Sequence, residues 1–222
     1  QTSCNLDASC LDGDCPSFMT VAVDPAAPPA ATPEPGQEAA LGAPVAIVNT
    51  DTVDIRLAGV GGTGVVTVAQ ILATAAMFDG DEVRGLDQTG ISQKAGPVVS
   101  DIRLSRSTEL TSSLISEGGA DVILAFDLRV GASEDVLHVG DPDRTVLVAS
   151  STETPTGSMV GHPSRQLPDL TELLDRAAGV TRTQDNKVVD AGRAGTGMFG
   201  DTSSAGVYLR GVAVQAGAVP VE

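Results

Sequence analysis

The stretch from residue 53 to residue 77 limits the possible folds of this chain more than any other part of the sequence. VDIRLAGV is a short apolar run that predicts a buried strand, and TGVVTVAQILATAAMF has apolar residues at helical spacing. Between them, GVGGTG at residues 59–64 fits the pattern G-x-G-x-x-G directly after a strand and directly before a helix. This order predicts the opening of an α/β domain.

The alternation of strands and helices continues to the end of the chain. We expect further strands in EVRGLD, PVVSDIRLS, ADVILAFD and RTVLVASS, and a short one near residues 188–191. PVVSDIRLS alternates with a period of two residues, which predicts a strand that is half exposed or at a sheet edge. Helices are expected in LRVGASEDVLHV, at residues 170–178 and at residues 203–216, the last capped by Asp201 or Thr202.

Strands that alternate with helices are typical of parallel sheets with crossover helices. We therefore predict, for residues 53–222, a three-layer α/β/α domain with a largely parallel, Rossmann-like sheet. Because 41% of the residues are hydrophobic and only 2% are aromatic, the core is expected to consist of aliphatic side chains.

Two segments of different composition precede this domain. Residues 22–52 are rich in alanine and proline, and six of the thirteen prolines fall between residues 24 and 44. This composition predicts an extended, semi-rigid linker. Residues 1–21 hold all three cysteines and little that could form a core. Because the chain begins at Gln1 instead of methionine, we interpret it as a piece of a longer protein.

The three cysteines, Cys4, Cys10 and Cys15, are spaced C-x5-C-x4-C, and a proline follows the last one. Bacterial ferredoxin runs end in Cys-Pro, and thiolates are the usual ligands of iron–sulfur clusters, so we predict that these residues bind a 4Fe-4S cluster. Three unrelated free cysteines and a zinc site are the alternatives. A four-cysteine cluster and a four-cysteine zinc site each need one ligand more than these three cysteines supply. In a longer protein that ligand would lie upstream of Gln1.

The glycine-rich turn allows two interpretations. Glycines permit positive φ and close backbone approach, and a helix N-terminus offers free N–H groups and partial positive charge to a phosphate. Asp87, 23 residues after Gly64, would then accept hydrogen bonds from a ribose, as in a dinucleotide-binding fold. In the second interpretation, the glycines serve only a tight turn and the close packing of the helix on the sheet.

The net charge of −16 excludes several classes of partner. With only two lysines, Lys94 and Lys187, the chain repels nucleic acid and anionic membranes. No apolar run reaches the roughly 18–20 residues that span a bilayer, and the N-terminus lacks the order of a secretory signal. We expect a cytoplasmic protein that binds neither nucleic acid nor membranes.

Several separate motifs together resemble the single-chain indolepyruvate ferredoxin oxidoreductases. They are the cysteine run, GVGGTGVVTVAQILATAA, RGLDQTGISQKAGPVVSDIRLS and FGDTSSAGVYLRGVAVQAGAVP, which occur in that family's order. The resemblance covers nearly all of the chain except the proline-rich linker. It implies that residues 53–222 are the γ-type domain of a 2-oxoacid:ferredoxin oxidoreductase, and that residues 1–21 are the C-terminal part of a ferredoxin-like domain.

Enzymes of this family oxidatively decarboxylate 2-oxoacids on thiamine diphosphate, pass electrons through iron–sulfur clusters to ferredoxin, and transfer the acyl group to coenzyme A. The resemblance implies an oxidoreductase for indolepyruvate and other aryl pyruvates. Its partners would be ferredoxin, the remaining domains of the enzyme and further copies of the chain. No thiamine diphosphate motif occurs in these 222 residues, so this piece alone is expected to be inactive and to hold no catalytic residue.

The resemblance also changes how single residues are interpreted. Asp87 falls in a loop pattern of the family, which favours a position facing other domains over a ribose contact. Lys94 is a candidate for contact with a phosphate of coenzyme A, and a surface or interdomain salt bridge is the alternative. A free-standing NAD- or nucleotide-binding module and a non-enzymatic scaffold are the alternative functions. The candidate cofactor-binding residues are Gly59, Gly61, Gly62, Thr63, Gly64 and Lys94.

Overall fold

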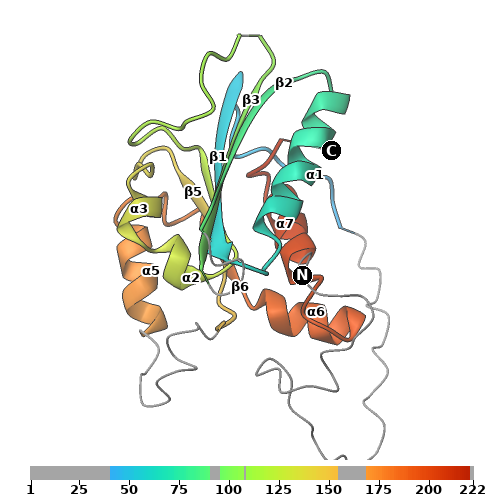
Figure 1. The fold of residues 1–222 in the computed structure, drawn as a ribbon, viewed down its shortest axis with the longest axis vertical. Helices are drawn as coiled ribbons and strands as arrows, with labels where there is room; N and C mark the ends of the chain where they lie inside the picture. The colour runs from blue at the N-terminus through green and yellow to red at the C-terminus, as the bar shows by residue number, and fades with distance from the viewer. Residues whose placement is uncertain (1–40, 91–95, 108, 155–168, 221–222) are drawn as a thin grey trace, which may run out of the picture. The chain divides into compact units, whose positions relative to one another are not determined.

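The computed structural model describes residues 41–90, 96–107, 109–154 and 169–220 (Figure 1). Within these ranges the chain forms a six-stranded sheet with helices on both faces, in the strand order β2-β3-β1-β4-β5-β6. Four residues with predicted roles, Cys4, Cys10, Cys15 and Lys94, lie outside the described residues. None of the helices in these ranges is long and apolar enough to cross a membrane.

One half of the sheet is parallel. The strand β1 (Thr52–Val60) pairs in parallel with β4 (Val122–Ala125). β4 pairs in the same way with β5 (Val146–Ser150), and β5 pairs with the short edge strand β6 (Lys187–Val189). All four strands arise where apolar runs were expected, and together they confirm the predicted largely parallel sheet.

The other half of the sheet contains one reversed strand. β3 (Pro97–Ser105) runs antiparallel to β1 on one side and to the edge strand β2 (Glu82–Thr89) on the other. The prediction that β3 is half exposed or at an edge was therefore wrong. Its period-two pattern comes from Asp101 and Arg103, which form ion pairs with β1 instead of facing water.

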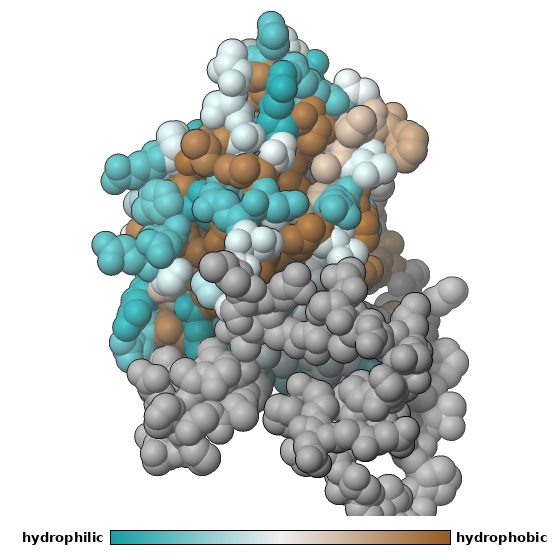
Figure 2. All heavy atoms as spheres, in the orientation of Figure 1, coloured by the Kyte–Doolittle hydropathy of each residue, from teal (hydrophilic) through white to brown (hydrophobic). Residues whose placement is uncertain are grey.

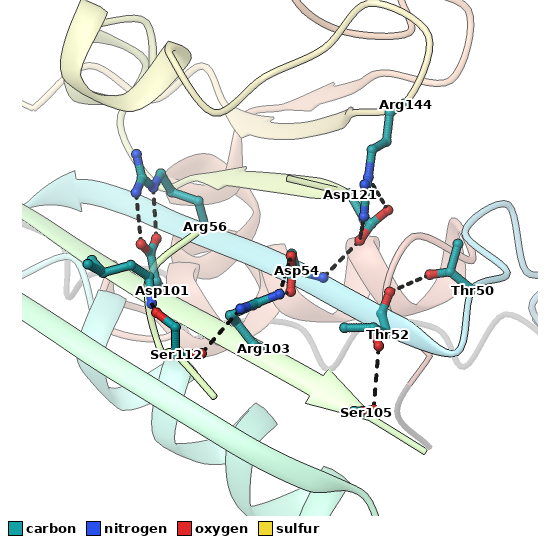
Figure 3. Close-up of polar contacts among 11 residues, drawn as sticks. Thr50, Thr52, Asp54, Arg56, Asp101, Arg103, Ser105, Ser112, Asp121 and Arg144 are labelled. Carbon is teal, nitrogen blue, oxygen red and sulfur yellow. Dashed lines mark hydrogen bonds and ion pairs between the residues drawn. The ribbon is translucent and has the colours of Figure 1, made fainter. Parts of the chain in front are cut away.

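Those ion pairs belong to a row of charged side chains across three strands (Figure 3). Arg56 binds Asp101 at 2.7 Å, and Arg103 binds Asp54 at 2.8 Å. Both pairs join residues that lie directly opposite each other on β1 and β3. A slip of two residues in either direction would place Arg56 opposite Arg103 or Asp54 opposite Asp101, so the charges help to fix the register.

The row continues from Asp54 to the start of β4. The N–H group of Asp54 donates to Asp121 Oδ2 at 2.8 Å, and Arg144 binds the same carboxylate with Nε and Nη2 at 2.8 and 2.9 Å. The hydrogen bond and charge of Asp121 raise the pKa of the Arg144 guanidinium, whereas burial lowers it. This arrangement ties the N-terminal ends of β1 and β4 together.

Two long helices cover one face of the sheet. α1 (Val65–Phe78) packs across β3 and β2, and α7 (Ala205–Gln215) packs beside it over the parallel half. Their buried faces join Val122 and Leu124 of β4 in one aliphatic core. This layer confirms the helix expected after the glycine-rich turn.

The opposite face carries three shorter helices, α2 (Leu128–Gly131), α3 (Glu134–Leu137) and α5 (Leu170–Ala178). They form a second core with the intervening residues of β4 and β5, which completes the predicted three layers. α5 has the predicted bounds. The prediction of a single helix in LRVGASEDVLHV was wrong, because the extended backbone of Ser133 separates α2 from α3.

The C-terminal segment differs from the prediction in two further ways. α6 (Ala191–Phe199) was not predicted, since three of its nine residues are glycine, which lowers helix propensity. Its N-cap is Asp190, whose carboxylate accepts from the N–H group of Arg193. The prediction that Asp201 or Thr202 caps the last helix was also wrong, because α7 begins after Ser204 and no side chain caps it.

Candidate functional site

The glycine-rich turn links β1 to α1, as the sequence predicts. Gly62 and Gly64 have φ values of 101° and 90°, in the left-handed region that other residues rarely adopt. A Cβ atom at either position would meet no atom within 4 Å, so the requirement is conformational. Gly64 is the N-cap residue of α1, and no side chain caps this helix.

Other glycines near the turn are needed for close packing. A Cβ on Gly59 would lie 2.8 Å from Phe126 Cβ and 2.8 Å from Thr63 Oγ1. A Cβ on Gly206 of α7 would lie 2.9 Å from the carbonyl oxygen of Thr63. The helix α7, the turn and the end of β4 therefore approach one another more closely than a side chain allows, which supports the packing interpretation for Gly59.

Two predicted binding residues have donors that already bond within the protein. The N–H group of Gly61 donates to the carbonyl oxygen of Gly96 at 2.7 Å. Thr63 donates to the carbonyl oxygen of Val60 from its N–H group, at 3.1 Å, and from Oγ1, at 2.7 Å. Gly61 and Thr63 therefore shape the turn, and these donors are not free to hold a ligand.

The turn borders a pocket of about 370 Å³ at the carboxyl ends of the parallel strands. The first residues of α6 and α7 form another wall, so two helix N-termini meet the turn that leads into α1. Glu153 is the single charged side chain among the described residues that line it. Five lining residues carry hydroxyl groups: Thr63, Ser150, Thr152, Thr154 and Thr202.

One hydrogen-bond network fixes the wall of this pocket between β5 and α6. Thr152 Oγ1 donates to Asp190 Oδ1 at 2.8 Å and accepts from Ser150 Oγ and from the N–H group of Gly192. The bond from the N–H group of Arg193, followed by the bond from Thr152, lowers the pKa of Asp190. The N–H groups of Gly192 and Arg193 at the start of α6 are thus already bonded. The uncapped N-terminus of α7 and the hydroxyl groups of Thr154 and Thr202 are the lining groups that suit an anionic or sugar-like ligand.

Asp87 does not reach the site that the dinucleotide interpretation requires. The strand that carries it, β2, is separated from β1 by β3, and Asp87 accepts a 2.6 Å hydrogen bond from Ser100 Oγ. It lines neither the 370 Å³ pocket nor the hollow of about 430 Å³ on the other side of the turn. The inserted strand therefore removes the geometry in which Asp87 would bind a ribose.

A larger groove of about 940 Å³ lies on the sheet face that carries the charged row. Arg56 lines it, but its guanidinium group already donates to Asp101 and to the carbonyl oxygen of Asp135. None of the predicted binding residues that the structure describes lies there. In the described ranges, no group of three or more His, Cys, Asp and Glu side chains is arranged to hold a metal ion.

Several residues of the pocket were missed at the level of sequence. Ser150 is the last residue of β5 and Thr152 follows soon after it, in the run VASST, and Thr202 precedes α7. A signal existed for the first two, because ligands of parallel α/β sheets bind beyond the carboxyl ends of the strands. No such rule indicated Thr202, which reaches the pocket only through the position of α6 and α7.

Comparison with known proteins gives concordant results. The family model described as pyruvate ferredoxin/flavodoxin oxidoreductase matches residues 54–220. The indolepyruvate oxidoreductase subunit IorB of Archaeoglobus fulgidus is 30% identical over 128 residues, which are 58% of this chain and 60% of that protein. The chain thus matches about 60% of that relative's length.

Two solved structures share the fold. The pyruvate oxidoreductase subunit PORC of Thermotoga maritima has a TM-score of 0.53 and 17% identity, over 77% of this chain and 80% of that one. The 2-oxoglutarate:ferredoxin oxidoreductase of Magnetococcus marinus has a TM-score of 0.52 and 18% identity, over 74% of this chain and 24% of that one. At these identities the likeness establishes the architecture alone.

Proposed function

Because the chain belongs to the pyruvate ferredoxin/flavodoxin oxidoreductase family, we propose that it supplies the γ-type domain of a 2-oxoacid:ferredoxin oxidoreductase. The observation that carries this proposal is the family match over residues 54–220, which includes every described strand except the first two residues of β1. The glycine-rich turn and its pocket lie inside the matched region. In this proposal the thiamine diphosphate site belongs to other parts of the enzyme.

The similarity to IorB supports indolepyruvate and other aryl pyruvates as the substrates. The electron acceptor in this proposal is ferredoxin, and the cysteines of residues 1–21 contribute ligands to a 4Fe-4S cluster. Purification of the tagged chain from its native cells tests the assembly. We expect a polypeptide with bound thiamine diphosphate to copurify, whereas a chain that purifies alone under gentle, oxygen-free conditions would contradict the proposal.

We propose further that the 370 Å³ pocket receives a phosphate-bearing part of coenzyme A. The uncapped N-terminus of α7 and the hydroxyl groups of Thr154 and Thr202 offer donors, and Lys94 is a candidate to add positive charge. Glu153 disfavours an anion in its immediate surroundings, so the phosphate is expected on the side of the helix termini. Gly59, Gly61, Gly62, Thr63 and Gly64 then act mainly by shaping the turn.

A carboxylate placed at the start of α7 tests this second proposal. Thr202→Glu puts a negative charge into the pocket from an exposed position, and we expect the KM for coenzyme A of the assembled enzyme to rise about tenfold or more, with the KM for the 2-oxoacid unchanged. Thr171→Glu, at the exposed start of α5, is the matched control. Equal effects of both substitutions would refute the assignment.

The alternative function, a free-standing NAD-binding module, makes a different prediction. Calorimetric titration would then show tight NAD binding that is lost in Asp87→Ala. The hydrogen bond between Asp87 and Ser100, and the position of β2 beyond β3, count against a ribose contact from Asp87 and therefore against this alternative.

A further inference from the structure

The helix α1 has a composition that its surroundings in the described structure do not explain. None of its fourteen residues is Asp, Glu, Lys or Arg, although the chain has a net charge of −16. Its buried side, from Val65 to Ala76, faces the sheet. Its other side is also uncharged and includes three exposed apolar side chains: Ile71, Met77 and Phe78 expose 37%, 65% and 87% of their surface.

A helix without a charged face is usually covered on both sides. The outer stripe of α1 runs through Thr67, Gln70, Ile71, Thr74, Met77 and Phe78, which recur at intervals of three and four residues. Figure 2 shows white to brown surface over much of this helix, at the right of the view, beside strongly hydrophilic surface elsewhere. Phe78 alone exposes on the order of 150 Å² of aromatic surface.

The neighbouring edge of the sheet is also open. β2 is eight residues long and, among the described strands, bonds to β3 alone; five of its residues are exposed, among them Gly85. The opposite edge strand, β6, has three residues. Natural proteins usually shorten or cover such edges, because a long unpaired strand can bind another strand. α1 packs across β2, so the open edge and the uncharged stripe lie on the same side of the domain.

From these two features we infer that α1 and β2 form the contact between two copies of this chain. A twofold axis perpendicular to the sheet would pair the two β2 strands antiparallel and set the two α1 helices against each other on the same face. Such a contact is self-complementary, since an uncharged helix meets an uncharged helix and an open strand edge meets an open edge. This inference does not depend on the proposed enzymatic function.

Charge directs any contact between two copies to this face. Two chains of −16 repel each other over their acidic surfaces, and the uncharged face of α1 permits close approach. If Gly85 pairs with its own counterpart, Glu82 faces Gln88 and Arg84 faces Leu86, so no like charges are opposite. The helix and the strand are about 21 Å and 26 Å long, a suitable size for a standard interface of roughly 800 Å² per partner.

Sedimentation velocity of the full chain tests this inference. At about 10–100 µM, above a dissociation constant of about 1 µM, we expect twice the monomer mass of 22.4 kDa. Phe78→Glu should raise the dissociation constant at least about 100-fold. Its matched control is Phe199→Glu, at the end of α6, where the phenylalanine is 56% exposed. Circular dichroism and thermal melts establish that both variants stay folded.

Three results would overturn the inference: a monomer throughout this concentration range, a dimer that Phe78→Glu does not weaken, or a monomer whose α1 face is covered by a different subunit. An independent measurement uses a spin label on Thr74→Cys with the three native cysteines replaced by serine. A short distance between the labels of two copies supports the contact of α1 with α1, and a long distance overturns it.

Discussion

Replacing Arg56 with methionine should lower the free energy of unfolding by about 3–5 kcal/mol. The side chains of Arg56 and Asp101 are 4% and 0% exposed, and two guanidinium nitrogens hold the carboxylate at 2.7 and 2.8 Å. A third nitrogen donates to the carbonyl oxygen of Asp135 at 3.1 Å. The substitution leaves the Asp101 carboxylate buried without its counter-ion, which is the costly way to break a buried pair.

Urea denaturation measures this loss, and the melting temperature should fall by roughly 6–20 °C in a domain of this size. Arg176→Met is the control, because the ion pair of Arg176 with Glu172 is 56% and 58% exposed and should contribute less than about 0.5 kcal/mol. The double variant Arg56→Met, Asp101→Leu should recover most of the stability, since it removes the unpaired charge.

Two results would refute this reasoning about the charged row. The first is a loss below about 1 kcal/mol for Arg56→Met, which would mean that Asp101 finds water or another partner. The second is a double variant no more stable than the single one. In that case the loss would come from packing of the arginine stem and not from an unpaired carboxylate.

Three further outcomes are expected. Gly59→Ala should lower the free energy of unfolding by about 1–3 kcal/mol in urea denaturation, because the new Cβ would lie 2.8 Å from Phe126 Cβ. Gly197→Ala in α6 is the control: its Cβ would meet no atom within 4 Å, so it should be neutral or stabilising. Asp190→Ala should lower the free energy of unfolding by about 1 kcal/mol at pH 7. Because the pKa of Asp190 is lowered in the folded state, the difference between the two proteins should disappear as the pH falls below 3.8. Urea denaturation at a series of pH values from 7 to 3 measures it. A form of the chain extended upstream of Gln1 should bind a 4Fe-4S cluster on anaerobic reconstitution, measured as iron and sulfide, and Cys10→Ser should abolish it; an unchanged cluster would identify other ligands.

The sequence was sufficient to predict elements whose signals are local. The strand, glycine-rich turn and helix at the start of the domain follow from apolar spacing and from glycines that need positive φ, and α5 begins after the capping Asp169. The pairing of β3 was not predictable in this way. Whether Asp101 faces water or a buried arginine depends on a strand more than forty residues away, as the bond between Arg56 and Asp101 shows.

The candidate site was predictable in position but not in composition. The glycine-rich turn marked where the pocket lies, yet its donors at Gly61 and Thr63 bond to neighbouring carbonyl groups. The hydroxyl groups of Thr152 and Thr202 come from segments that the parallel topology and α6 bring together. The three glycines of α6 lower its helix propensity, so the sequence did not predict this helix or the pocket wall that it forms.

The most direct test of the proposed function is the activity of the assembled enzyme with and without this chain. The complete assembly, prepared without oxygen, should reduce ferredoxin when given indolepyruvate and coenzyme A, and omission of this chain should abolish the reduction. The reaction should also be slower with pyruvate than with aryl pyruvates. Full activity in the absence of the chain, or no coenzyme A-dependent oxidation of any 2-oxoacid in its presence, would contradict the account.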